Sequence, residues 1–193
     1  MRTKLIFLLL TLAGIINFAA CKKDNFDTMP PETRSGKNTF GCLIDGDLFV
    51  GGWGAPWMKP ALSAAYRPTL GRLYISTWGK RNNTFGGEIG ITIDNPKENA
   101  TQKFAEAYYA PASDFRPPIG TIGNDTAYCL TLGTVDDGIC TITKFDMNKK
   151  IVSGRFEFMG RCTSVAFDTT ATVAITQGRF DLKFDVMNDV NNE

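Results

Sequence analysis

The sequence predicts an all-β fold: a single antiparallel β-sandwich or barrel-like domain of about eight to ten strands, with at most one short helix. Composition is one reason, because 14 Phe, 19 Gly and many Thr are spread over 193 residues with few runs of helix formers. Alternation is another, because residues 180–186 read Phe-Asp-Leu-Lys-Phe-Asp-Val. Many short segments of this kind, linked by turns, are typical of sandwiches and barrels.

The elements are expected in the following order. Residues 40–44 and 47–50 flank Asp45-Gly46, a pair that tolerates positive φ and suits a hairpin turn. Alternation over 73–78 and 89–93 predicts two more strands, with a polar turn at 79–83. Residues 101–109 place Phe104 and Tyr108 four apart with alanines between them, which predicts the short helix. Further strands are expected at 128–132, 139–146, 152–158, 173–175 and 180–186.

Residues 1–20 have the layout of a bacterial lipoprotein signal peptide. A basic start and an apolar run over 5–18 precede Ala19-Ala20-Cys21. This run is shorter than the roughly 20 residues that a membrane-spanning helix needs. We therefore expect cleavage before Cys21 and lipidation of Cys21. An ordinary signal cut elsewhere and an uncleaved anchor are the alternatives.

The rest of the chain divides into three parts. Residues 21–37 contain Pro30-Pro31 and almost no apolar periodicity, which predicts a lipidated flexible tether. Residues 38–187 form the β domain, and residues 188–193 a polar C-terminal tail. The expected location is the outer membrane, to which acyl chains bind the protein. Either the periplasmic face or the cell surface fits this anchor.

Composition also excludes several kinds of chemistry. The chain has no histidine, which excludes Ser-His-Asp, Cys-His and His-zinc sites. No Ser-x-x-Lys or Gly-x-Ser-x-Gly motif occurs. Without residues 1–20, 19 basic and 20 acidic residues remain, a balance that argues against nucleic acid as a partner. Neither Asp45-Gly46-Asp47 nor Asp136-Asp137-Gly138 has the spacing of a calcium loop. We therefore expect that the protein is not an enzyme and that it binds no cofactor and no metal ion.

Four cysteines besides Cys21 remain, namely Cys42, Cys129, Cys140 and Cys162. An even number in an exported protein predicts two disulfides, for which three pairings exist. Cys129 with Cys140, close together across a turn region, and Cys42 with Cys162 are the expected pairs. Free buried thiols are the alternative.

A Gly- and Pro-rich loop at 51–60 carries Trp53 and Trp57. Together with Tyr66 and Trp78, these tryptophans are the candidate ligand-binding residues, because aromatic rings on a rigid β scaffold can stack on sugar rings or an extended peptide. The alternative is a lid that folds back over the core.

Two segments resemble each other: Ser-Gly-Arg-Phe-Glu-Phe at 153–158 and Gln-Gly-Arg-Phe-Asp-Leu-Lys-Phe at 177–184. They are expected to be strands in similar environments, each with Gly at a bulge or a close approach. The segments 40–46, 142–146 with 151–156, and 175–181 resemble an uncharacterised family of Bacteroidota lipoproteins. The resemblance implies a β fold and an envelope location, and it brings no catalytic residue.

These observations predict a lipid-anchored cell-envelope β module with a non-catalytic binding or structural role. Its partners would be the membrane, through the acyl chains, and a glycan or peptide ligand. A small barrel that carries an apolar ligand in a Phe-lined cavity is one alternative. A glycan hydrolase that uses two facing carboxylates is the other.

Overall fold

The computed structural model describes residues 26–54, 60–110, 128–131, 138–164 and 169–187. These residues contain twelve strands in one sheet and no helix, so the predicted all-β fold is confirmed. The strands are β1 (Thr39–Ile44), β2 (Asp47–Gly51), β3 (Leu62–Arg67), β4 (Arg72–Arg81), β5 (Thr84–Asp94), β6 (Ala100–Lys103), β7 (Glu106–Ala110), β8 (Tyr128–Thr131), β9 (Ile139–Asp146), β10 (Ile151–Ser164), β11 (Thr169–Lys183) and β12 (Asp185–Val186).

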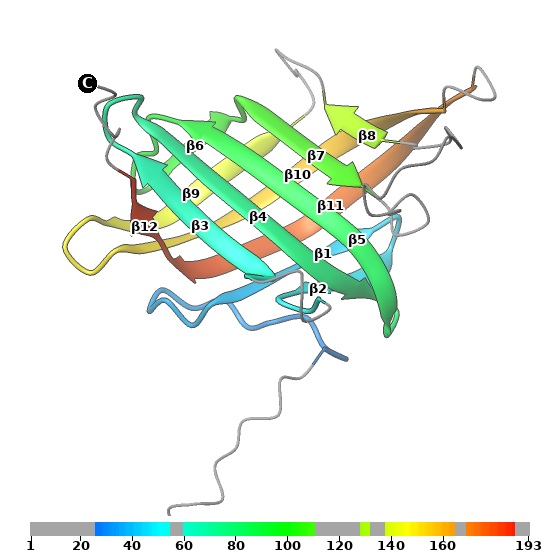
Figure 1. The fold of residues 1–193 in the computed structure, drawn as a ribbon, viewed down its shortest axis with the longest axis horizontal. Coiled ribbons are helices and arrows are strands. Elements are labelled where there is room, and N and C mark those ends of the chain that lie inside the picture. The colour runs from blue at the N-terminus through cyan, green and yellow to red at the C-terminus, as the bar shows by residue number, and fades with distance from the viewer. Residues whose placement is uncertain (1–25, 55–59, 111–127, 132–137, 165–168, 188–193) are drawn as a thin grey trace, which may run out of the picture.

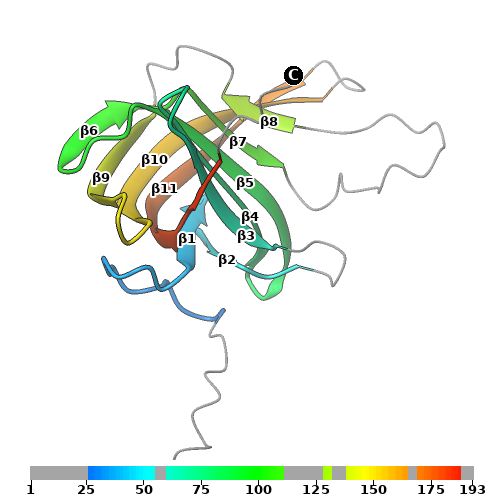
Figure 2. The same cartoon turned by 60° about the vertical axis from the view of Figure 1, so that its left-hand side comes forward.

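The sheet curls until its strands meet (Figure 1). Neighbouring strands follow the order β11-β1-β2-β4-β5-β7-β8-β10, and β10 also pairs with β11, all antiparallel. The first half of β10 pairs with β9, and β9 in turn pairs with β6. The first half of β4 carries β3, with the two-residue β12 parallel to it. The result is a curled, barrel-like sheet in which the β10–β11 pairing joins the two ends of this order, and β9, β6, β3 and β12 are added at its edges (Figure 2).

The opening hairpin is confirmed. Ile44 pairs with Asp47, and the two turn residues between them, Asp45 and Gly46, have φ angles of 51° and 88°. Positive φ at both central residues is the geometry that joins antiparallel strands with the correct twist.

The helix predicted over residues 101–109 is wrong. Part of this segment is β6, at the edge beside β9, and part is β7, between β5 and β8. In β7, Ala107 and Tyr109 are buried while Glu106 and Tyr108 are more exposed. This burial has a period of two, so strand pairing outweighs the local four-residue spacing of Phe104 and Tyr108.

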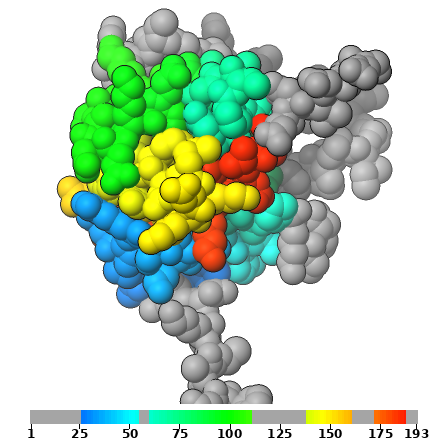
Figure 3. Space-filling model, turned by 90° about the vertical axis from the view of Figure 1, so that its left-hand side faces the viewer, coloured from blue at the N-terminus to red at the C-terminus, as the bar shows by residue number. Residues whose placement is uncertain are grey.

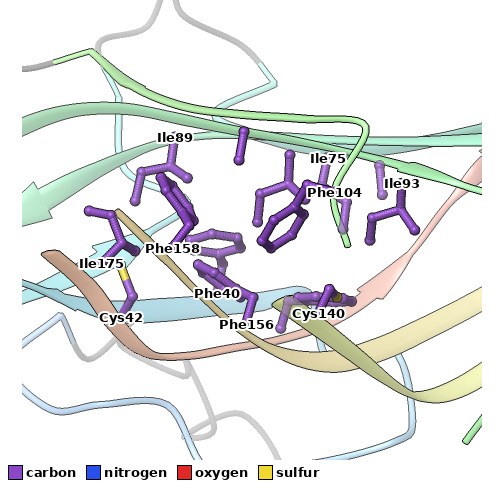
Figure 4. Close-up of a cluster of buried hydrophobic side chains, with 14 of the residues drawn as sticks. Phe40, Cys42, Ile75, Ile89, Ile93, Phe104, Cys140, Phe156, Phe158 and Ile175 are labelled. Carbon is purple, nitrogen blue, oxygen red and sulfur yellow. The ribbon is translucent and has the colours of Figure 1, made fainter. Parts of the chain in front are cut away.

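Apolar side chains fill the interior of the curled sheet, between its two opposite walls. Phe156 lies at the centre, with its ring centroid 5.0 Å from that of Phe40, 6.3 Å from Phe158 and 6.2 Å from Phe180. Figure 4 shows Phe40, Phe156 and Phe158 side by side, with Ile75 and Ile89 from the opposite layer. The interior around these rings is therefore a packed hydrophobic core.

The two similar Gly-Arg-Phe segments lie next to each other, one in β10 and one in β11. Because they run antiparallel, Gly154 faces Phe180, Arg155 faces Arg179 and Phe156 faces Gly178. A Cβ atom on Gly178 would lie 2.6 Å from the Phe156 ring, and one on Gly154 would lie 2.7 Å from the Phe180 ring. Each ring thus covers the glycine opposite it, which confirms the predicted close approach.

Residues 26–38, which we call the strap, pack on the outer face of β1, β10 and β11. Asp181 holds the strap and is itself only 1% exposed. The donors to its two carboxylate oxygens are the hydroxyls of Thr33 (2.5 Å) and Ser153 (2.7 Å) and the backbone N–H groups of Ser35 (3.1 Å), Gly36 (2.8 Å) and Lys37 (3.1 Å). Burial alone raises the pKa of Asp181, but the hydrogen bonds from Thr33, Ser153 and the strap backbone outweigh it, so the net pKa lies below its usual value.

Further contacts fix the first half of the strap. Pro30 is buried and occupies the place where a side chain on Gly41 would be. Arg155 pairs with Glu32 at 2.6 Å. In Figure 3 the blue N-terminal segment lies against the yellow β9–β10 region. The sequence predicted a flexible tether over residues 21–37; over 26–37 the structure shows this packed strap instead. Residues 21–25 lie outside the described residues.

The predicted disulfide pairs are wrong. Cys42 and Cys140 are fully buried free thiols, and each predicted bridge needs one of them. Burial raises the pKa of Cys140 to about 12, so its thiol is protonated and unreactive at neutral pH. The backbone register instead places Cys129 directly opposite Cys162, in β8 and β10.

Candidate functional site

Five partly exposed side chains gather on the outer face near the β4–β5 turn, and we call them the aromatic cluster: Phe26, Trp53, Trp78, Lys80 and Phe85. The Trp78 and Phe85 rings stack with centroids 5.9 Å apart, and the Trp53 ring centroid is 5.6 Å from that of Phe85. The Lys80 ammonium lies 5.1 Å from the Trp53 ring centroid and 5.3 Å from that of Phe26. These distances fit cation–π contacts.

Strand alternation and one short loop build this cluster. In β4, Leu73, Ile75 and Thr77 point into the core, which leaves Trp78 and Lys80 on the outer face. The backbone N–H groups of Gly52 and Trp53 both donate to the Trp78 carbonyl, at 2.9 and 3.2 Å. The loop after β2 is thereby tied to β4, which brings Trp53 to Trp78.

A polar network continues from Trp78 across the same face. Glu88, opposite Trp78 in the register, accepts hydrogen bonds from the Ser76 hydroxyl at 2.6 Å and the Tyr108 hydroxyl at 2.8 Å. The Tyr108 ring lies over Gly90, where any side chain would collide with it. Burial, together with the hydrogen bond to Glu88, raises the pKa of Tyr108 well above its usual value. Tyr108 therefore stays a neutral hydrogen-bond donor.

A groove of about 580 Å³ borders the cluster. Phe26 belongs to both, and Pro30 of the strap, Val50 of β2 and Leu62 of β3 also line the groove. This volume is within the roughly 300–1,000 Å³ range of small-ligand sites. The groove therefore extends the surface that a ligand on the cluster can reach.

The predicted binding residues are only partly brought together. Trp53 and Trp78 meet through Phe85. Tyr66 lies elsewhere, packed edge-on against Phe145 and Phe184 with ring centroids 5.2 and 6.2 Å away. Trp57 lies outside the described residues.

Several members of the site were not predicted. Lys80 continues the outer-face alternation of Trp78, so the pattern of β4 already contained it. Phe85 pairs with Lys80 across the turn at Asn82-Asn83, a pairing that a hairpin prediction at this turn would have revealed. Phe26 had no local signal, because it belongs to the segment that was expected to be a flexible tether.

The carboxylates that were considered as calcium ligands near the first hairpin make structural contacts instead. Asp45 accepts the Ala174 N–H at 2.8 Å, and Asp47 pairs with Arg81 at 2.7 Å. Among the residues that the structure describes, no three His, Cys, Asp or Glu side chains gather in a way that could hold a metal ion. The same residues contain no helix with the length and apolar character needed to cross a membrane.

Comparison with known proteins adds no assignment to this geometry. No protein-family model matches the chain, and neither a curated protein nor a solved structure matches it.

Proposed function

We propose that the protein is a lipid-anchored, non-catalytic binding module of the cell envelope, located at the outer membrane. The anchor is supported by the signal-like sequence over residues 1–20 and by Cys21 after it. The binding role is supported by the aromatic cluster, which places Trp53, Trp78 and Phe85 together on a partly exposed face of a rigid sheet.

A glycan is the ligand class that suits this face best. Sugar rings present C–H groups that pack on aromatic faces, and hydroxyl groups that exchange hydrogen bonds with carboxylates and hydroxyls. Trp78 supplies a ring directly beside the Ser76–Glu88–Tyr108 network. An extended peptide, which can also stack on the rings and donate hydrogen bonds to Glu88, is the alternative ligand class.

Trp78→Ala is expected to weaken glycan binding at least tenfold, about 1.4 kcal/mol, because the ring beside Glu88 is lost. A glycan array would find the ligand, and calorimetry on the wild type and the variant would measure the affinity. Leu70→Ala is the control, since Leu70 is an exposed apolar residue outside the cluster. Equal array profiles for the wild type and Trp78→Ala would contradict the proposal, and a peptide ligand would change the assigned class.

The packing of the core weighs against a carrier with a Phe-lined cavity. Phe156, Phe158, Phe180 and Phe184 are each at most 3% exposed and pack on one another or on neighbouring rings. They therefore fill the space that an internal ligand would need.

An envelope location also predicts an oxidised cysteine pair. The register supports Cys129 with Cys162. Directly opposed residues of antiparallel strands have Cα atoms about 4.5–5.5 Å apart, within the roughly 4.4–6.8 Å that a disulfide spans. The two thiols would pass two electrons and two protons to a disulfide of an envelope oxidoreductase.

We expect one Cys129–Cys162 bridge and free thiols at Cys42 and Cys140. Alkylation of the unfolded, unreduced protein followed by peptide mass spectrometry should find the linked pair, lighter by two hydrogen atoms. In Cys162→Ser, Cys129 should become open to alkylation. Alkylation of all four cysteines in the wild-type protein purified from its envelope would contradict the bridge.

A further inference from the structure

The strap limits how far the domain can lie from its lipid anchor. Only five residue steps separate Cys21 from Phe26, the first residue that the structure describes. A fully extended chain spans at most about 3.6 Å per residue, so the Cα atoms of these residues lie within about 18 Å of each other. Twelve further residues of the expected tether, 26–37, are bound to the sheet as part of the strap.

This reach is short compared with the domain. A domain of roughly 160 residues has a radius of gyration of about 15 Å and thus a diameter approaching 40 Å. The anchor point cannot lie at the far side of the molecule from Phe26. In Figures 1 and 2 the strap runs along the lower edge, whereas the turn between β3 and β4 lies at the upper end.

We propose that the strap edge of the domain faces the bilayer directly and is a lipid-contacting surface. This orientation rests on the lipidation of Cys21 in the proposed function. Sheet strands β1, β10 and β11 would lie behind the strap, and the β3–β4 turn would point away from the membrane.

The side chains at this edge suit a lipid surface. Arg34 and Lys37 are exposed on the strap and can reach lipid phosphates. Asp27 and Glu32 are exposed as well, and Glu32 is neutralised by its ion pair with Arg155. The orientation is inferred from the short chain between Cys21 and Phe26, and the charges on the strap are compatible with it.

The test uses the full-length lipidated protein in vesicles of phosphatidylethanolamine and phosphatidylglycerol that contain a headgroup-quenching lipid. A fluorescent amino acid is introduced at Asp27 in the strap, at Thr84 in the β4–β5 turn, or at Leu70 in the β3–β4 turn. All three positions are exposed. Quenching should be strongest at position 27, clear at 84 and weakest at 70.

Release of the strap should remove the difference in fluorescence quenching between positions 84 and 70. Asp181→Ala deletes the carboxylate that holds the strap, and Thr33→Val with Ser153→Ala is a milder second variant. Equal quenching at 84 and 70 in the wild-type protein would overturn the orientation. Incorporation of a clickable fatty acid is measured in parallel. Protein that carries no fatty-acid label and does not float with the vesicles would overturn the anchor itself. Labelled protein that shows equal quenching at positions 84 and 70 would overturn only the orientation.

Discussion

Replacement of Asp181 by Ala is expected to lower the free energy of unfolding by about 2–4 kcal/mol and to detach the strap. The carboxylate is 1% exposed and collects three backbone N–H groups of the strap as well as the hydroxyls of Thr33 and Ser153. Without it, these donors must either stay unpaired or return to water by leaving the sheet. Urea unfolding measures the free energy, and amide exchange at Ser35, Gly36 and Lys37 reports the strap.

Asp185→Ala is the matched control, because Asp185 is an exposed carboxylate only four residues away. It should change the free energy of unfolding by less than about 0.5 kcal/mol. Unchanged exchange at Gly36 in Asp181→Ala would contradict the role of this carboxylate.

The same residue predicts an acid dependence. The pKa of Asp181 in the folded protein lies below its usual value, because the hydrogen bonds outweigh burial. Its stabilisation is therefore present above the pKa of the unfolded chain, about 3.9, and is lost as the pH falls through the folded pKa. Strap protection should thus decrease in strong acid, and Asp181→Asn should abolish this part of the pH dependence.

Phe156→Ala is expected to cost about 3–5 kcal/mol of unfolding free energy. The Phe156 ring is 3% exposed, contacts Phe40, Phe158 and Phe180, and covers Gly178 on the neighbouring strand. Its removal leaves a cavity and uncovers the glycine backbone. Urea unfolding of this variant and of Phe85→Ala gives the comparison.

Phe85 is partly exposed on the outer face, so Phe85→Ala should cost less than about 1.5 kcal/mol. An equal loss in the two variants would contradict the assignment of Phe156 to the centre of the core.

Local patterns were sufficient for most strands and failed where distant residues decide. Asp45-Gly46 identified its hairpin because positive φ is a property of those two residues. Residues 101–109 were misread because a helix and a strand both fit a short apolar segment, and only pairing with β5 and β8 selects the strand. The strap was missed for the same reason, since its partner Asp181 lies about 145 residues away in the sequence.

The binding face shows the same division. Trp53 and Trp78 could be selected as unusual residues on a loop and a strand, but their union depends on backbone hydrogen bonds between the loop after β2 and β4. Tyr66 was predicted as a binding residue only because it is aromatic. The register places it opposite the buried, inward-facing Leu73, so it does not share the outer face with Trp78. Residue type therefore indicates the chemistry of a site, whereas the register decides which residues share it.

The strap also has a mechanical consequence. Tension applied at the N-terminus first loads the hydrogen bonds that meet at Asp181 and the ion pair of Glu32 with Arg155. The strap can then peel away before β1 leaves the sheet. Thirteen residues released in this way would lengthen the chain by up to about 45 Å, so a pulled domain could extend from its attachment point while its core stays folded.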